Sequence, residues 1–365
     1  MRVHAVLSAQ AYQSFRVPLD EVMQLGPAQD AALEELQNPG WALHEFDFAK
    51  GEAVFLDVGA QCNLFEAGFA YQKMMRSARR AAFLPFDQFL AFAAAMPAPS
   101  RLIHLFNMGH CGSTLLHQVF NASGAVWSLS EPKFAADLGI NRAGLSGARR
   151  KAMAQAGLAW LARLPFAGER PAMVLKHFSH GIKLMLEWAA ASPSGTVNLF
   201  MYRDAASWCN SRFGFAQRRG FPTVMTPEIR RARWFGMSAG MPESVLEGIV
   251  DMEAAELRFD DLAAMCWALF VQDYQSAVQA GLNLLPFSYA DLRDNREATL
   301  RRIFAACGLP EDSVGPALQA FNKDSHEGES TAHDKPVAKL PPDSSGRIAS
   351  ILSHPRLKLD GNARL

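Results

Sequence analysis

The sequence predicts an α/β fold in which a central parallel sheet is flanked by helices. Short apolar runs alternate with longer stretches of helical periodicity, which is the pattern of consecutive strand–helix units. The four runs that predict strands are RLIHLFNM (101–108), AMVLK (172–176), TVNLFMYR (196–203) and LNLLPFSY (282–289). Gly109, Lys176 and Arg203 stand at or just after the ends of three of these runs. Because ligands of parallel sheets bind beyond the carboxyl ends of the strands, these positions predict a ligand site.

The helices between the strands are predicted from periodicity and from capping residues. Ser113 opens one helix and Gly124 follows its end, while Asp204 caps the helix after the third strand. Asp294 and Glu297 resemble a capping box before the helical stretch ATLRRIF. The other predicted helices cover residues 147–163, 181–191 and 265–278.

Three segments are expected along the chain. Residues 1–100 are predicted to form a mostly helical N-terminal extension packed on the core, with an extended piece or two such as EAVFLDVG (52–59). Residues 101–321 hold the α/β core, with a variable insertion at 219–261 in which Pro, Gly and charged residues alternate. Residues 322–365 begin with a long polar stretch and end with a short apolar helix. A polar stretch of that length is typical of either a linker or a loop that covers a ligand.

The composition and the residue spacing exclude several classes of function. Lys plus Arg and Asp plus Glu number 36 each, so no global field attracts nucleic acid and no nucleic-acid partner is expected. The apolar window 81–96 is interrupted by Pro85 and Asp87, so no membrane span is expected. The 5 cysteines are widely spaced without a CxxC pair, which predicts no metal site and a reducing, cytoplasmic location.

The segment GHCGSTLLH (109–117) predicts an anion-binding loop after the first strand of the core. The first N–H groups of a helix lack internal partners, and Gly109 and Gly112 allow the backbone to turn several of them toward one anion. Ser113 and Thr114 add hydroxyl donors. A Walker-type loop would carry a Lys directly before the Ser or Thr, and this loop has none. The alternative is an ordinary strand–turn–helix junction with glycines for steric reasons.

Further motifs follow the loop in a fixed order. They are SEP (130–132), VLK (174–176), Arg203-Asp204 with Ser211 eight residues after Arg203, and YADL (289–292). Together with Cys111-Gly112-Ser113-Thr114, these motifs resemble those of the sulfotransferases that use 3′-phosphoadenosine-5′-phosphosulfate (PAPS), in the bacterial and tyrosylprotein-type branch. The resemblance covers roughly residues 65–325 and implies a P-loop nucleotide-hydrolase-like sulfotransferase fold.

The resemblance also implies a role for each motif. The enzyme would transfer a sulfuryl group from PAPS, without a metal, to a hydroxyl or amine of a small-molecule or peptide acceptor. Glu131 would accept the proton of the acceptor, and Lys176 would stabilise the transferring group. The residues that would bind the co-substrate are Gly109, Cys111, Gly112, Ser113 and Thr114 in the loop, Arg203 and Ser211 at the 3′-phosphate, and Ser325, Gly328 and Ser330 in the polar tail that would cover the nucleotide.

Several of these assignments have a structural alternative. Glu131 precedes Pro132, a residue suited to a helix start, so the alternative for its carboxylate is a helix cap or a surface charge. Lys176 can be a solvated charge at a strand end, and Arg203 can be an ordinary ion-pair partner of a neighbouring acid. The polar tail can be a linker.

His110 stands where the family has Lys or Arg. A neutral imidazole neutralises less charge than an ammonium, although a bound anion favours its cationic form. Three outcomes are open: His110 acts as an imidazolium and general acid, Lys176 carries the charge alone, or the protein binds the nucleotide without turnover. We favour the first. The competing functions are a catalytically impaired PAP- or nucleotide-binding protein and, disfavoured by the missing loop Lys, an NTP-dependent kinase.

Overall fold

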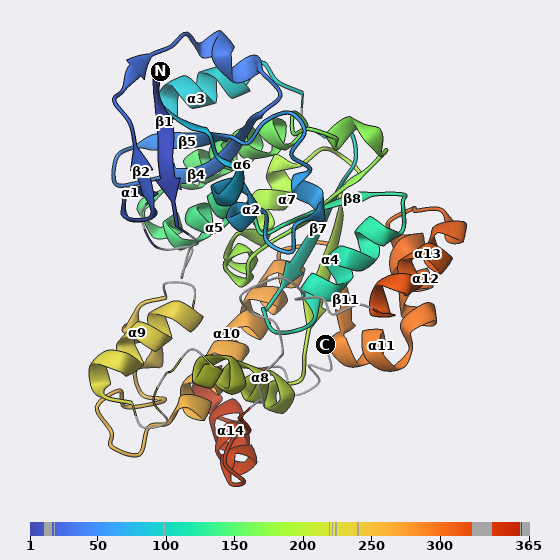
Figure 1. The fold of residues 1–365 in the computed structure, drawn as a ribbon. Coiled ribbons are helices and arrows are strands. Elements are labelled where there is room, and N and C mark those ends of the chain that lie inside the picture. Colours follow the sequence, from blue (N-terminus) through green and yellow to red (C-terminus); the bar gives the residue numbers. More distant parts are fainter. Residues whose placement is uncertain are drawn as a thin grey trace.

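The fold contains two sheets, which lie at the top and in the middle of Figure 1. This computed structural model describes residues 1–10, 17, 19–97, 99–218, 220, 222, 225–238, 241–322, 338–357 and 359. The middle sheet carries the candidate site. The N-terminal sheet and a group of helices at the bottom of the view pack around it.

The middle sheet is parallel throughout, which confirms the predicted α/β fold class. Its strands run in the order β11-β10-β7-β9-β8. Their bounds are Leu102–Asn107 for β7, Trp127–Ser130 for β8, Met173–Lys176 for β9, Val197–Tyr202 for β10 and Leu285–Ser288 for β11. The chain builds β8 and β9 on one side of β7 and then crosses to the other side for β10 and β11. The order of the strands therefore reverses at β7, and a crevice for ligands is expected beyond its carboxyl end.

Helices flank this sheet close to their predicted positions. They include α4 (Ser113–Ala122), α5 (Lys133–Ile140), α6 (Gly147–Leu161), α7 (Met185–Ala191), α8 (Ala205–Arg218), α10 (Phe259–Gln279) and α12 (Arg296–Ala306). Asp204 caps α8 by accepting a hydrogen bond from the Ser207 amide at 2.8 Å. The predicted capping box at Asp294 and Glu297 is wrong: Asn295 begins α12 without a side-chain cap. A capping box formed by Ser288 and Asp291 instead opens α11 (Tyr289–Asp294).

The prediction of a mostly helical segment 1–100 is wrong. This segment holds an antiparallel sheet with the strand order β2-β1-β6-β5-β4, and β3 pairs with β1. The strands are β1 (Arg2–Ala9), β2 (Met23–Leu25), β3 (Gln29–Asp30), β4 (Trp41–Asp47), β5 (Glu52–Asp57) and β6 (Arg80–Pro85). The α-helices among these residues are short: α1 (Leu19–Val22), α2 (Ala70–Ser77) and α3 (Phe86–Ala93).

The N-terminal sheet contacts helices α5 and α6 through strand β4. The indole of Trp160 in α6 donates a hydrogen bond to the Trp41 carbonyl at 3.2 Å. Phe46 in β4 packs against Phe134 in α5 with ring centroids 5.7 Å apart. The ammonium of Lys133 forms buried ion pairs with Glu45 of β4 at 2.7 Å and with Asp137 at 2.9 Å. Apolar and charged contacts thus hold the N-terminal sheet on the core.

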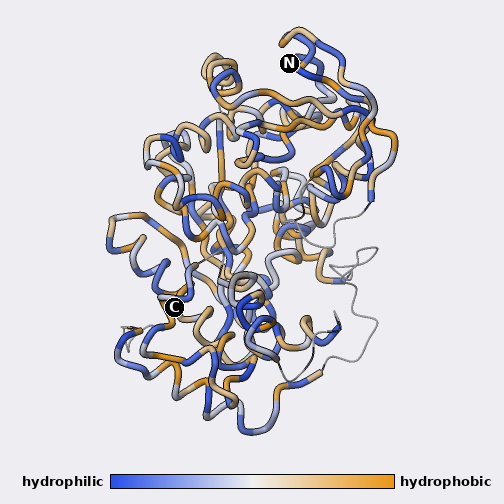
Figure 2. Tube along the Cα trace, turned by 90° about the vertical axis from the view of Figure 1, so that its left-hand side faces the viewer, coloured by the Kyte–Doolittle hydropathy of each residue, from blue (hydrophilic) through white to orange (hydrophobic). Residues whose placement is uncertain are grey.

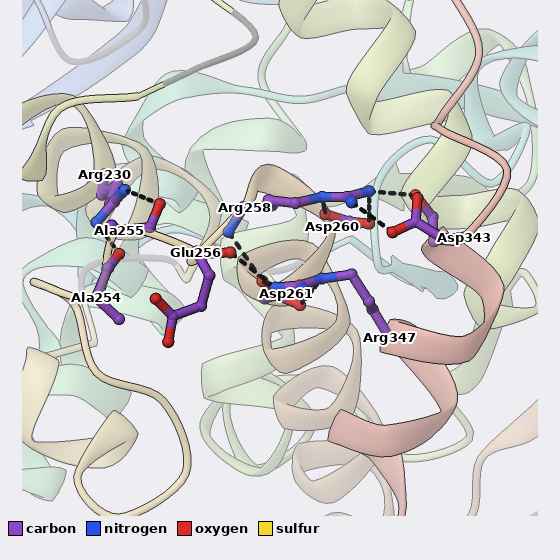
Figure 3. Close-up of polar contacts among 10 residues, drawn as sticks. Arg230, Ala254, Ala255, Glu256, Arg258, Asp260, Asp261, Asp343 and Arg347 are labelled. Carbon is purple, nitrogen blue, oxygen red and sulfur yellow. Dashed lines mark hydrogen bonds and ion pairs between the residues drawn. The ribbon is translucent and has the colours of Figure 1, made fainter.

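The insertion and the C-terminal segment form helices at the bottom of Figure 1. They are α9 (Pro227–Met237) and α14 (Ser344–Leu352). In Figure 3, Arg258 at the start of α10 lies between Asp260 and Asp343, and Arg347 of α14 reaches Asp261. These ion pairs fix the C-terminal segment on α10. The backbone amide of Leu340 donates to the side chain of Asn210 in α8 at 2.9 Å, so the segment also contacts α8 beside Ser211.

Hydrophobic and hydrophilic stretches are mixed along the whole tube in Figure 2. Of the helices in the described part of the chain, none has the length and apolar character needed to cross a membrane.

Candidate functional site

The site is built on the turn between β7 and α4, which we name the 109–114 loop. Gly109, His110 and Gly112 have φ angles of 69°, 51° and 85°, all in the left-handed region. The left-handed region costs a residue with a side chain about 1 kcal/mol or more, so His110 is held there by its surroundings. The amides of Gly112 and Thr114 make no hydrogen bond to a described residue. Such a turn exposes several donors at the positive end of a helix, which favours an anion.

Asn107, the last residue of β7, fixes the shape of the loop. Its side-chain amide donates to the His177 carbonyl at 2.6 Å. Its side-chain oxygen accepts from the Gly109 amide at 3.0 Å and from the Ser113 hydroxyl at 3.2 Å. The Ser113 hydroxyl therefore orders the loop instead of facing a ligand. The hydroxyl of Thr114 makes no hydrogen bond to a described residue and is available as a donor.

Cys111 contributes its backbone to the loop. Its side chain is fully buried, and burial raises the pKa of the thiol to about 11, although the nearby charge of Lys176 opposes the shift. The thiol is therefore neutral and points into the core.

Gly112 and Tyr289 fit closely together. A Cβ atom placed on Gly112 would lie 2.5 Å from Cδ2 of Tyr289, which follows β11. The guanidinium of Arg203 lies over the same tyrosine ring, 4.8 Å from its centroid. Only glycine leaves room for this ring at this φ.

Three predicted residues meet on the α8 side of the loop. The guanidinium of Arg203 donates to the His110 carbonyl at 3.3 Å, and its buried Nε has no hydrogen-bond partner. The Ser211 hydroxyl lies 3.4 Å from Nδ1 of His110. The indole of Trp208 donates to the carbonyls of Met108 and Gly109 at 3.1 and 2.7 Å, which holds α8 against the loop. The buried, unpaired donor of Arg203 fits an anion better than the alternative of an ion pair with a neighbouring acid.

Glu131 and Lys176 meet at the ends of β8 and β9. The fully buried ammonium of Lys176 forms an ion pair with the carboxylate of Glu131 and lies 3.2 Å from the Ser130 hydroxyl. It also lies 5.6 Å from the centroid of the Phe69 ring. Pro132 is the N-cap of α5 and has no side-chain cap, so Glu131 does not cap this helix. Lys176 is not the solvated charge of the alternative interpretation.

Glu131 has a φ of 54°, so it is a second residue with a side chain in the left-handed region at this edge of the sheet. His110 in the loop and Glu131 thus both have a left-handed backbone conformation. Backbone strain of this kind concentrates at functional sites.

The structure thus brings the predicted residues together at one edge of the sheet, apart from the tail. Ser325, Gly328 and Ser330 lie outside the described residues. Sequence reasoning missed Asn107, Trp208 and Phe69. The signal for Asn107 was its place as a polar residue at the end of an apolar strand directly before the loop. Among the described residues, no group of three or more His, Cys, Asp or Glu side chains could hold a metal ion.

No protein-family model matches the chain, and no curated protein matches it significantly. Among solved structures, it is similar to the sulfotransferase domain from the curacin biosynthetic pathway, with 14% identity and a TM-score of 0.38 over 70% of this chain and 98% of that one. It is also similar to retinol dehydratase in complex with androsterone and the inactive cofactor PAP, with 12% identity and a TM-score of 0.36 over 89% of this chain and 98% of that one.

Proposed function

We propose that this chain is a PAPS-dependent sulfotransferase that moves a sulfuryl group to a hydroxyl or amine of a small-molecule or peptide acceptor. The observation that carries the proposal is the position of the 109–114 loop, which follows β7 at the carboxyl edge of the parallel sheet. Arg203, directly after β10, and Ser211 of α8 flank the loop. The Glu131–Lys176 pair lies at the ends of β8 and β9. An anion cradle beside a carboxylate and an ammonium suits the transfer of a negatively charged group.

The residues present fit a nucleotide with two separate anionic groups, such as PAPS. The buried Nε of Arg203 lacks a partner, the Thr114 hydroxyl is available, and Tyr289 offers an aromatic face next to the guanidinium. Arg203 and Ser211 would bind the 3′-phosphate, and the loop amides with Thr114 would bind the 5′ side. PAPS supplies the activated sulfuryl group when it is bound.

The Glu131–Lys176 pair supplies a proton acceptor and a positive charge for the transfer step. Glu131 would take the proton of the acceptor as a bond forms between the acceptor atom and sulfur and the bond from sulfur to the nucleotide phosphate breaks. Once protonated, Glu131 no longer holds the positive charge of Lys176. The buried ammonium of Lys176 can then stabilise the sulfuryl oxygens.

His110 would be the cation and general acid that replaces Lys or Arg. Its Nδ1 faces Ser211, and its ring packs edge-on against Phe215 with centroids 5.0 Å apart. The second candidate function is a nucleotide-binding protein without turnover, and the observation that favours it is this contact of His110 with α8. An NTP-dependent kinase is disfavoured because the loop carries no Lys.

A thermal-shift panel with PAP (the desulfated product of PAPS), ATP and GTP tests the proposal. We expect stabilisation by PAP that saturates at micromolar concentration and exceeds that by ATP or GTP. Transfer of label from radioactive PAPS to an acceptor panel follows. Stabilisation by ATP but not by PAP would overturn the proposal, and PAP binding without transfer or hydrolysis would favour the binding protein.

All 5 cysteines are free thiols and 4 of them are buried. This state supports the proposed location in a reducing, cytoplasmic compartment.

A further inference from the structure

Arg212 is a half-buried arginine without an anionic partner. It follows Ser211 on α8, and its guanidinium forms no hydrogen bond or ion pair with any described residue. The guanidinium lies over the ring of Trp208, 5.2 Å from the centroid. Burial lowers the pKa of Arg212, and only the thiols of Cys266 and Cys209 oppose the shift. Partly desolvated arginines are normally paired, because an uncompensated charge away from water is costly.

The surroundings of Arg212 place it beside the 109–114 loop. Residues 208, 211, 212 and 215 share one face of α8. Trp208 on this face donates to the Gly109 carbonyl, and Ser211 contacts His110. Arg212 therefore lies on the face of α8 that is turned toward the loop.

A second cation in this region, Lys183, comes from the segment after β9. Lys183 lies in the turn Ser179–Leu184, and its ammonium is 5.8 Å from the Phe270 ring of α10. The Phe270 ring in turn packs edge-on against Trp208 with centroids 6.0 Å apart. Burial raises the pKa of the Cys266 thiol to about 12, and the charges of Arg212 and Lys183 both oppose that shift, so both cations lie near this thiol. Lys183 is neutralised by its ion pair with Asp273, whereas Arg212 is not.

We infer that Arg212 binds an anionic group of the acceptor, namely a carboxylate, sulfate or phosphate. This inference rests on the proposed function, in which the acceptor reaches the Glu131–Lys176 pair at the ends of β8 and β9. Arg203 and Tyr289 lie together on the β11 side of the loop, where the nucleotide phosphate would bind. The ring of Trp208, which Arg212 contacts, packs against Phe270 of α10. Phe270 also contacts Lys183 in the segment after β9, so Arg212 lies toward the acceptor side. A planar guanidinium suits bidentate binding of each of these anions.

The test is an anion titration of protein saturated with PAP, with thermal stability and calorimetry as readouts. Inorganic sulfate and inorganic phosphate are compared with chloride at equal ionic strength. We expect a saturable stabilisation by sulfate and phosphate in the wild type and in Arg218→Met, which removes another arginine of α8. Arg212→Met should lose it, and Arg212→Lys should weaken it about tenfold because a bidentate pair becomes monodentate.

Two outcomes overturn the inference while PAP still binds. One is a wild type that responds to sulfate no more than to chloride, and the other is a response that survives in Arg212→Met. In the first case, a response that appears in the protein without PAP would move Arg212 to the nucleotide. If PAP fails to bind but the Arg212-dependent response persists, the proposed function fails and the anion site stands.

Protein stability gives a second readout. Removal of an uncompensated charge should leave the melting temperature of Arg212→Met unchanged or higher, whereas loss of a structural arginine would lower it.

Discussion

The ammonium of Lys176 forms an ion pair with the carboxylate of Glu131, and this pair joins the carboxyl ends of β9 and β8. The lysine side chain has no exposed surface, and 12% of the Glu131 side chain is exposed. The backbone amide of Glu131 also donates to the Lys176 carbonyl at 2.8 Å. Removal of one partner of a buried pair leaves an unpaired charge, so breaking the pair should destabilise the fold as well as disturb the proposed chemistry.

Glu131→Gln separates these two roles. The amide keeps the shape of the side chain and accepts a hydrogen bond from Lys176, but it cannot take a proton. We expect the rate of sulfuryl transfer in a single turnover to fall about 10²- to 10⁴-fold, with PAP affinity within about threefold of the wild type. Glu66→Gln, at an exposed carboxylate near β8, is the control. A transfer rate within threefold of the wild type would remove Glu131 from the chemistry.

Arg203→Met and Ser211→Ala are expected to weaken nucleotide binding. Loss of a charge-assisted pair to phosphate costs about 2–3 kcal/mol, so PAP affinity should fall about 30- to 150-fold in Arg203→Met. Ser211→Ala removes one hydrogen bond, and a fall of about tenfold is expected. Calorimetric titration with PAP measures both. Arg218→Met, in the last turn of α8, controls for a general loss of positive charge, and equal losses in Arg218→Met and Arg203→Met would contradict a specific role.

The parallel sheet could be predicted because its strands are short buried runs that end at a Gly or a charged residue. Strand β8 was missed since WSLS is short and half polar, although Ser128 and Ser130 are fully buried and hydrogen-bonded. The N-terminal sheet could not be predicted from alternation. Strand β4 is buried on both faces and includes His44 and Glu45, whose polar side chains hide the strand pattern. The sheet also depends on the pairing of β1 with β6, which are distant in sequence.

The site could be predicted where a motif fixes a residue by its place along the chain, as for Gly112, Glu131 and Arg203. The supporting side chains could not, because their partners are remote in sequence. Asn107 binds the carbonyl of His177, which is 70 positions away, and Trp208 binds that of Gly109, 99 positions away. The contact of Ser211 with His110 likewise depends on how α8 packs on the loop, which no local pattern encodes.

Gly112→Ala tests the fit between the loop and Tyr289. The added Cβ would lie 2.5 Å from the tyrosine ring, so the ring or the loop must move and the donors for the anion are displaced. We expect PAP affinity to fall at least tenfold, measured by thermal shift and calorimetry.

Gly124→Ala is the matched control for this substitution. Gly124 also has a left-handed backbone, with φ of 73°, but a Cβ there meets no atom within 4 Å. Both variants should therefore lose about 1 kcal/mol of stability from backbone strain, and only Gly112→Ala should lose nucleotide affinity. Equal PAP affinity in the two variants would show that contact with Tyr289 is irrelevant to the ligand.

His110→Lys tests the proposed general acid. If an imidazolium protonates the leaving oxygen, the wild-type transfer rate falls as pH rises through the titration of His110, whereas a lysine variant stays protonated over this range. We expect this fall in rate to be absent between pH 6 and about 8.5 in the variant. Ser211→Ala, which removes the contact at Nδ1, should shift the wild-type profile without abolishing it. If the variant keeps both the rate and the profile of the wild type, His110 has no catalytic role.

The buried group of Glu45, Lys133 and Asp137 predicts a dependence of stability on pH. Two carboxylates share one ammonium there, and the Phe46 amide donates to Asp137 at 3.1 Å. His44, the next charged or titratable neighbour, is buried and its pKa is well below the ordinary range because of burial and the charge of Lys133. Burial raises the pKa of Asp137 to about 7, and Glu45 adds to the shift while Lys133 opposes it.

Asp137 should therefore stabilise the fold most in mild acid. Its unfolded pKa is near 4, so between about pH 4 and 7 the folded chain holds a proton that the unfolded chain has released. This contribution is fully present below about pH 4 and is lost as pH rises toward 7, with a fall of about 2 kcal/mol between pH 5 and 7. Asn mimics the protonated carboxyl, so Asp137→Asn should lose most of this slope in urea unfolding at pH 5, 6 and 7. Burial also raises the pKa of Glu45, so the stability of the variant should keep a smaller dependence on pH. Asp87→Asn, at a side chain that is 89% exposed, should keep the wild-type slope. An unchanged slope in Asp137→Asn would show that another group carries the proton.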